Sequence, residues 1–167
     1  PGQTGVRGRR VAILVAAGVD GTSAGKLYAG LLKAGAVPRL VSNLLGKVES
    51  LDGERLDVEI SVEAGPSVMY DAVIVPDGAQ AVEALAKNAQ VLEFLREQYR
   101  HGKPILAYGS GSDLLTKAMI PQKLPDGSAD PGLILGDPAN AELALDAFKT
   151  ALASHRVFAR ETDPPSV

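Results

Sequence analysis

The chain contains no cysteine and no tryptophan, only two histidines, and few aromatic side chains of any kind. Without cysteine there can be no disulfide bond, no thiolate metal site, no iron–sulfur cluster and no cysteine nucleophile. The two imidazoles, His101 and His155, stand far apart in the sequence and are not expected to converge with carboxylates on one ion. The sequence therefore predicts that this chain binds no metal and carries no cofactor of its own.

The chain also lacks a strong excess of charge of either sign and any long apolar run. The formal net charge of the 167 residues is −3 at pH 7, which gives no basic surface for a nucleic-acid partner. No continuous apolar run approaches the ~18 residues that a membrane span needs, so no membrane partner is expected either. The composition indicates no particular cellular compartment, and the hydrophobic share of 46% is ordinary for a globular domain.

A Gly-rich polar stretch opens the chain and a Pro-rich polar stretch closes it. We expect residues 1–8 to be the tail of a linker from a longer polypeptide. Residues 9–160 are expected to form one domain, which is long enough to bury a single hydrophobic core. Residues 161–167 are expected to be a C-terminal tail.

Short apolar runs alternate with amphipathic helical patterns through this domain. Buried strands are predicted at residues 11–17, 36–42, 72–76, 104–108 and 133–135. Turn signals over residues 44–68 predict a small β excursion, with a last short strand at residues 67–69. The helix over residues 79–100 is expected to break near Lys87 and Asn88. The alternation predicts a flavodoxin-like, doubly wound α/β fold with a mainly parallel sheet and helices on both faces.

Three loops follow strands at the carboxyl edge of the predicted sheet, where ligands of open α/β sheets bind. They are residues 18–25, 76–79 and 109–112. The first stands where a phosphate loop would, but its glycines are too close for the pattern G-x-x-x-x-G-K-S/T, and Leu27 replaces the hydroxyl residue. FMN is also disfavoured, because few aromatic side chains are present to stack on a flavin. We expect this loop to begin a helix that is capped by Thr22 or Ser23.

The loop of residues 109–112, called the elbow below, offers Ser110 as a candidate nucleophile. A catalytic serine needs a base within hydrogen-bond reach, but His101 precedes the strand that leads into the elbow and so belongs to the opposite edge of the sheet. The residues favour the alternative, a strand-to-helix turn capped by Ser110 or Ser112. A carboxylate dyad of Asp77 and Asp113 is a further candidate. The residues favour a simpler explanation, in which Asp77 is a turn residue and Asp113 is an acid in the first turn of a helix that suits the helix dipole.

Three stretches together resemble a known family. They read VEAGPSVMYDAVIVPDG at residues 62–78, GKPILAYGSGS at residues 102–112 and SHRVFAR at residues 154–160. Residues 9–160 as a whole resemble the C-terminal domain of large-subunit haem catalases. The elbow alone is typical of a wider group, the class I glutamine-amidotransferase-like superfamily, which includes the PfpI-like proteases.

In that superfamily, the resemblance implies a catalytic cysteine at Gly109, a histidine at Ser110 and an acidic partner near residues 18 and 19, with Asp20 close by. Neither of the first two residue types is present at its position. The resemblance therefore implies a degenerate elbow with no catalytic set, in which Asp20 and Ser110 are weak candidates. It also implies that residues 1–8 are the linker from a preceding catalytic part, which this sequence lacks. The haem of the parent catalase would belong to that part.

We therefore expect a non-catalytic auxiliary domain of a haem catalase, the enzyme that dismutes hydrogen peroxide. Its partners would be the catalase core and the sister subunits of a tetramer, which the domain would stabilise. On its own it would act as a chaperone-like holdase on unfolded client proteins. Two alternatives stay open: a standalone PfpI-like hydrolase that uses Ser110, and a small-ligand-binding module at the elbow, residues 109–112.

Overall fold

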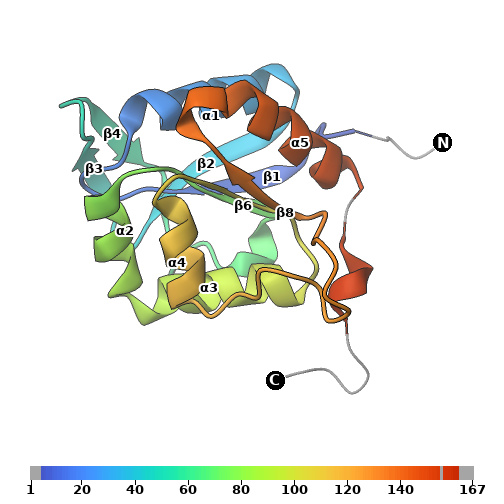
Figure 1. The fold of residues 1–167 in the computed structure, drawn as a ribbon. Coiled ribbons are helices and arrows are strands. Elements are labelled where there is room, and N and C mark those ends of the chain that lie inside the picture. Colours follow the sequence, from blue (N-terminus) through green and yellow to red (C-terminus); the bar gives the residue numbers. More distant parts are fainter. Residues whose placement is uncertain (1–4, 155, 162–167) are drawn as a thin grey trace.

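A parallel sheet between two layers of helices forms the body of the domain (Figure 1). The computed structural model describes residues 5–154 and 156–161. The strands of the main sheet are β1 (Arg10–Leu14), β2 (Val37–Ser42), β5 (Ile60–Ser61), β6 (Ala72–Val75), β7 (Ile105–Tyr108) and β8 (Leu133–Gly136). The α-helices are α1 (Gly21–Lys33), α2 (Ala79–Ala86), α3 (Ala89–Arg100), α4 (Gly111–Lys117) and α5 (Ala141–Ala153). The remaining elements are β3 (Gly46–Glu49), β4 (Arg55–Val58) and the 3-10 turns η1 (Ser67–Met69), η2 (Pro138–Asn140) and η3 (Phe158–Arg160).

The main sheet follows the order β5-β2-β1-β6-β7-β8, and every neighbouring pair in it is parallel. All of β6 and β7 is buried, and so is β1 after its first residue. A strand covered on both faces has no solvated side, which is why these segments read as continuous apolar runs. The predicted flavodoxin-like, doubly wound fold is confirmed.

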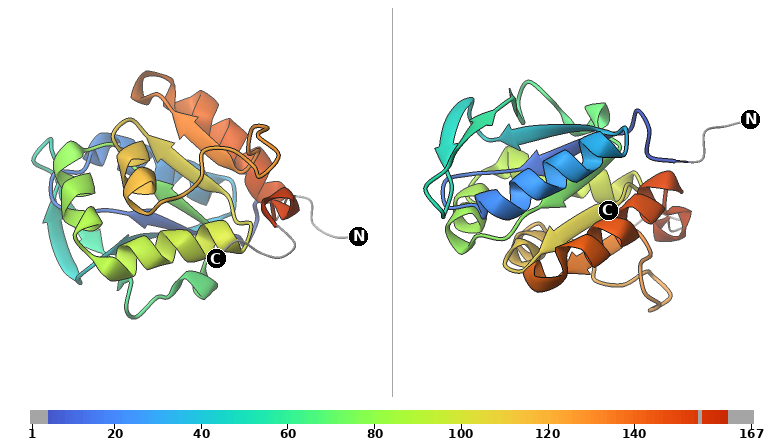
Figure 2. Two further views of the ribbon diagram at one scale, coloured as in Figure 1. Left: turned by 60° about the horizontal axis from the view of Figure 1, so that its bottom comes forward. Right: turned by 90° about the horizontal axis from the view of Figure 1, so that it is seen from above.

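The helices cover both faces of the sheet, with α1 and α5 on one and α2, α3 and α4 on the other (Figure 1). Seen from above, α1 and α5 lie side by side (Figure 2, right). The break between α2 and α3 falls where it was predicted. Lys87 closes the first helix, and the Asn88 side chain caps the second by accepting hydrogen bonds from two backbone N–H groups. Within the described residues, no helix combines the length and the apolar character that crossing a bilayer requires.

The predicted β excursion is present between β2 and β6. β3 and β4 pair antiparallel as a separate two-stranded sheet, and β5 then returns to the edge of the main sheet beside β2. The strand predicted at residues 67–69 is wrong, because these residues form the 3-10 turn η1. Two buried side chains form hydrogen bonds with the Ser67 carbonyl there. The Gln98 amide donates to it at 2.9 Å and the Lys103 ammonium donates at 3.3 Å.

The cap predicted for α1 is also wrong. Asp20, rather than Thr22 or Ser23, is the extended residue before the helix, and its carboxylate accepts a hydrogen bond from the backbone N–H of Ser23 at 3.2 Å. A carboxylate at this position satisfies one of the free N–H groups of the first turn and also suits the helix dipole.

A buried ion pair ties the end of the domain to its body. The Arg160 Nε donates to Asp130 Oδ2 at 2.6 Å, and the two side chains are only 2% and 0% exposed. A second nitrogen of the guanidinium donates to the Lys103 carbonyl at 2.7 Å, and its carbon lies 4.6 Å from the centre of the Tyr99 ring. The last turn, η3, is thereby fixed against the segments that enter β7 and β8.

Candidate functional site

The three loops singled out at the carboxyl edge of the sheet meet in the structure. The Asp20 N–H donates to the Asp77 carbonyl at 2.9 Å, and the Ser110 N–H donates to the Asp77 carboxylate at 2.9 Å. The cause is the topology, because β1, β6 and β7 are parallel neighbours whose carboxyl ends share one edge. The sequence placed these loops together, but it did not identify Asp77 as the residue that joins them.

Gly109 begins the elbow with a left-handed backbone, at φ +48°. This conformation is costly for a residue with a side chain, and glycine adopts it freely. A Cβ atom built on Gly109 would lie 2.7 Å from both Cγ and Oδ1 of Asp77, closer than real Cβ atoms come to such neighbours. The Asp77 carboxylate therefore occupies the space that a nucleophile at position 109 would need for its side chain.

The Ser110 hydroxyl is fully engaged within the site. It donates to Asp77 Oδ1 at 2.7 Å and accepts from the backbone N–H of Gly78 at 3.0 Å. Ser110 stands at the N-cap position of α4 but makes no capping hydrogen bond with its side chain, while the Ser112 hydroxyl donates backward to the Gly109 carbonyl at 3.0 Å. The predicted capping role of these serines is therefore wrong, since Ser110 holds Asp77 instead.

The electrostatics of this cluster favour the ionised form of Asp77 at neutral pH. Burial acts to raise the pKa of its carboxyl group, but hydrogen bonds from the Ser110 hydroxyl, the Ser110 N–H and the Gly78 N–H lower it further than burial raises it. A carboxylate with a lowered pKa that only accepts hydrogen bonds is a poor general base. The arrangement fixes three loops to one another rather than activating the serine.

The other candidate residues do not complete a catalytic set. The Asp20 carboxylate caps α1, and Asp113 is exposed in the first turn of α4. The described hydrogen bonds of the Asp77 carboxylate come from Gly78 and Ser110 rather than from Asp113. His101 lies at the end of α3, where its ring contacts Glu97 Oε2 at 3.2 Å, and it precedes β7 at the edge opposite the elbow. His155 lies outside the described residues. Over the described part of the chain there is also no cluster of three or more metal-ligating side chains.

The β excursion covers the first loop of the site, which the sequence reasoning missed. The Asp52 carboxylate, in the turn between β3 and β4, accepts hydrogen bonds from the Thr22 hydroxyl at 2.8 Å and the Ser50 hydroxyl at 2.7 Å. These bonds lower the pKa of Asp52. The backbone N–H of Leu51 also donates to the Val19 carbonyl at 2.8 Å. A turn signal at residues 52 and 53 was visible in the sequence, but its partner in the fold was not.

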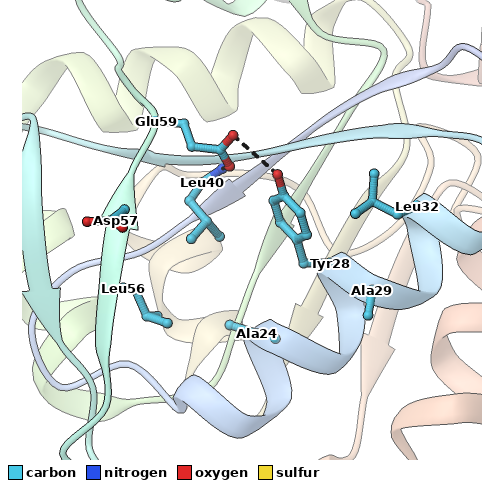
Figure 3. A pocket seen from close by; sticks show the side chains of 9 residues that line it. Ala24, Tyr28, Ala29, Leu32, Leu40, Leu56, Asp57 and Glu59 are labelled. Carbon is cyan, nitrogen blue, oxygen red and sulfur yellow. Dashed lines mark hydrogen bonds between the residues drawn. The ribbon is translucent and has the colours of Figure 1, made fainter.

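A separate apolar groove of about 320 Å³ lies between α1 and the excursion. Figure 3 shows Leu40 of β2, Leu56 of β4 and Ala24 of α1 around the hollow, with the Tyr28 hydroxyl donating to Glu59 at its rim at 3.2 Å. Four leucines of α1 and the excursion are strongly exposed: Leu32 (52%), Leu44 (72%), Leu45 (66%) and Leu51 (73%).

Comparison with known proteins decides the family. Residues 7–162 match the family described as the C-terminal domain found in long catalases. The chain belongs to this family. Among curated relatives of this long-catalase domain, catalase HPII of Pseudomonas putida is 38% identical over 167 residues, which cover 100% of this chain and 22% of that protein. Catalase-1 of Neurospora crassa is 31% identical over 98% of this chain and 25% of its own length. The chain thus spans about a quarter or less of these relatives.

Solved structures with a similar fold include ThiJ/PfpI and DJ-1 proteins. A ThiJ/PfpI domain protein from Brachyspira murdochii superposes with a TM-score of 0.77 at 14% identity, over 89% of this chain and 98% of that one. Oxidized DJ-1 of Toxoplasma gondii gives 0.72 at 16% identity, over 87% and 94%. At such identities the likeness shows the fold of the long-catalase domain and nothing of its chemistry.

Proposed function

We propose that this chain is a non-catalytic auxiliary domain of a haem catalase, in which peroxide chemistry belongs to the part of the protein outside these residues. The observation that carries the proposal is the position of Asp77. Its carboxylate occupies the space that a nucleophile at position 109 would need. It also accepts a hydrogen bond from Ser110, the candidate nucleophile of the elbow. The alternative of a hydrolase that uses Ser110 lacks a base among the described residues.

The tyrosines of this chain also do not fit an axial ligand for haem. Such a ligand needs an accessible hydroxyl, and each tyrosine has another place in the fold. Tyr28 donates to a carboxylate, Tyr70 packs against a phenylalanine ring, Tyr99 lies under a guanidinium, and Tyr108 donates to a backbone carbonyl. These tyrosines therefore offer haem no axial ligand.

The surface around the groove supports a packing role. Leu32 of α1 lines the apolar hollow and is 52% exposed, and the excursion carries three further exposed leucines, Leu44, Leu45 and Leu51. Exposed apolar surface of this kind marks interaction sites when it gathers into patches. The occupant we propose is the remainder of the catalase subunit or a sister subunit of its tetramer. The backbone N–H of Gly8 donates to the carbonyl of Gly35, just after the end of α1. Gly8 therefore lies beside the end of the helix that forms one wall of the groove, which favours this occupant.

The absence of catalysis is tested on the purified chain. We expect no Soret band in its visible spectrum after incubation with hemin and no consumption of hydrogen peroxide. A Soret band with turnover would overturn the proposal. Peptidase or esterase activity that is lost in Ser110→Ala would favour the hydrolase instead.

The packing role is tested in the full-length catalase. Leu44→Glu combined with Leu51→Glu should weaken the tetramer in analytical ultracentrifugation and lower its melting temperature, because both leucines would lose their apolar partner. Val68→Glu is the matched control, since Val68 is equally exposed, at 80%, but belongs to η1. Equal behaviour of the double variant, the control and the unmodified protein would contradict the packing role.

The same leucines also favour a second candidate, a holdase activity of the separate domain. Here the purified chain should suppress the aggregation of a heated client protein, and Leu44→Glu with Leu51→Glu should abolish that suppression. Failure of the unmodified chain to suppress aggregation would exclude this role and leave the packing role untouched.

A further inference from the structure

A small cavity of about 130 Å³ lies at the amino edge of the sheet, opposite the elbow. Arg9, Asp71 and Lys103 line it, and they come directly before β1, before β6 and near the start of β7. Because these strands are parallel neighbours, residues at their starts gather at one edge. Arg156 and Leu152 complete the lining, so that three of its four charged side chains are cationic.

Arg156 is placed by the backbone on either side of it. The N–H of Val157 donates to the Gly102 carbonyl at 2.6 Å, which holds the segment after α5 against the residue that precedes Lys103. A Cβ atom on Gly102 would lie only 3.4 Å from Cβ of Arg156. The two cations thus come together from segments that lie far apart in the sequence.

Two of the three cationic groups, Lys103 and Arg156, have hydrogen-bonding capacity to spare. Lys103 is only 8% exposed, yet its ammonium makes a single hydrogen bond in the described structure, at 3.3 Å to the Ser67 carbonyl. The Arg156 guanidinium makes no hydrogen bond or ion pair with any residue that the structure describes. The carboxylate of the lining, Asp71, accepts a hydrogen bond from the backbone N–H of Arg10 at 2.8 Å.

The charge state of Lys103 reflects this environment. Burial, the largest influence, lowers its pKa; Asp71 acts to raise it, Arg156 to lower it and Glu97 to raise it, and the pKa remains below its ordinary value. A buried ammonium is costly unless it is paired and hydrogen-bonded. An anion between Lys103 and Arg156 would remove their repulsion and use their free donors.

We propose that this cavity is an anion site, in which Lys103 and Arg156 bind a carboxylate or a compact oxyanion such as phosphate. The volume corresponds to about four liquid waters, which suits such a group. The source is either a free anion or an acidic side chain of the catalase polypeptide, since residues 9 and 156 lie near the two ends of the domain.

The test is a titration of the isotopically labelled chain with sodium phosphate and, separately, sodium acetate, at constant ionic strength set with chloride. We expect saturable shifts in the NMR spectrum at the amides of Asp71, Lys103 and Val157. Arg156→Gln, which changes an exposed residue, should weaken binding about tenfold or more, since a charge-assisted hydrogen bond is lost. Lys103→Met should do the same, and Arg100→Gln, an exposed cation of α3, should leave binding unchanged.

Two further measurements separate binding at this site from a general attraction of anions to surface cations. Binding should weaken as the pH rises through the lowered pKa of Lys103, while Arg156 keeps its charge throughout. Shifts that do not saturate, or that persist equally in Arg156→Gln, would overturn the proposal. If the full-length catalase also binds added phosphate, the natural occupant is a free anion. If the full-length catalase does not bind phosphate and Arg156→Gln lowers its melting temperature, the occupant is an acidic side chain of the protein itself.

Discussion

The buried pair of Asp130 and Arg160 supports the sharpest prediction on stability. In Arg160→Met, four hydrogen bonds disappear: two to Asp130, one to the Lys103 carbonyl and one to the Tyr99 carbonyl. The Asp130 carboxylate would stay buried, and its one remaining partner among residues 5–154 and 156–161 would be the Gly132 N–H, at 2.8 Å. Removal of one partner from a buried pair costs about 3–5 kcal/mol, because the other charge is left uncompensated.

That loss is a large part of the free energy of unfolding of a domain, which is roughly 5–15 kcal/mol. With a shift of roughly 2–4 °C per kcal/mol for a chain of this length, the melting temperature should fall by about 6–20 °C. Urea unfolding followed by circular dichroism measures the free energy directly. A lower urea midpoint with an unchanged m-value, the slope of the free energy against urea concentration, would assign the loss to the folded state.

The matched control is Arg100→Met, because Arg100 forms ion pairs with Glu93 and Glu97 on the exposed surface of α3. Exposed pairs contribute about 0–1 kcal/mol, so this variant should be nearly neutral. Equal losses in Arg160→Met and Arg100→Met would refute the reasoning. Combining Arg160→Met with Asp130→Asn should cost less than the sum of the two single changes, since neither charge is then left alone.

Further predictions concern the elbow, one strained residue and one buried phenol. Gly109→Ala should lower the free energy of unfolding by about 1–2 kcal/mol through its left-handed backbone alone, and a smaller loss in an Asp77→Gly background would verify the contact with the carboxylate. The pKa of Asp77 is lowered in the folded state, so the ionised carboxylate stabilises the fold above the unfolded pKa. That contribution is lost as the pH falls through the folded pKa. In Asp77→Asn, the free energy of unfolding should therefore fall less steeply below about pH 4. Met119 has φ +59° and is 76% exposed, so Met119→Gly should raise the free energy of unfolding by about 0.5–1 kcal/mol, and a lower value would contradict the strain argument. Burial raises the pKa of Tyr108 to about 12, so an alkaline absorbance titration should lose its last phase in Tyr108→Phe, which also costs about 1 kcal/mol for the bond to a carbonyl.

The fold was predictable because its signals are local. Each buried strand reads as a short apolar run and each helix as a pattern of period 3.6, and the break between α2 and α3 was predicted near Lys87 and Asn88. The prediction failed at residues 67–69, where β-type residues form a 3-10 turn. There the Ser67 carbonyl is bound by Gln98 and Lys103, side chains some thirty positions later, and no local pattern carries such information.

The candidate site divides in the same way. The sequence by itself determined that no cysteine chemistry is possible and that the elbow holds Gly109, since these depend only on which residues are present. Only the tertiary structure decided what the elbow does, because Asp77 and Ser110 are 33 positions apart and meet through the parallel order of β6 and β7. The burial of Arg160 against Asp130 was likewise decided by packing, as charged residues normally stay at the surface unless the fold supplies a partner.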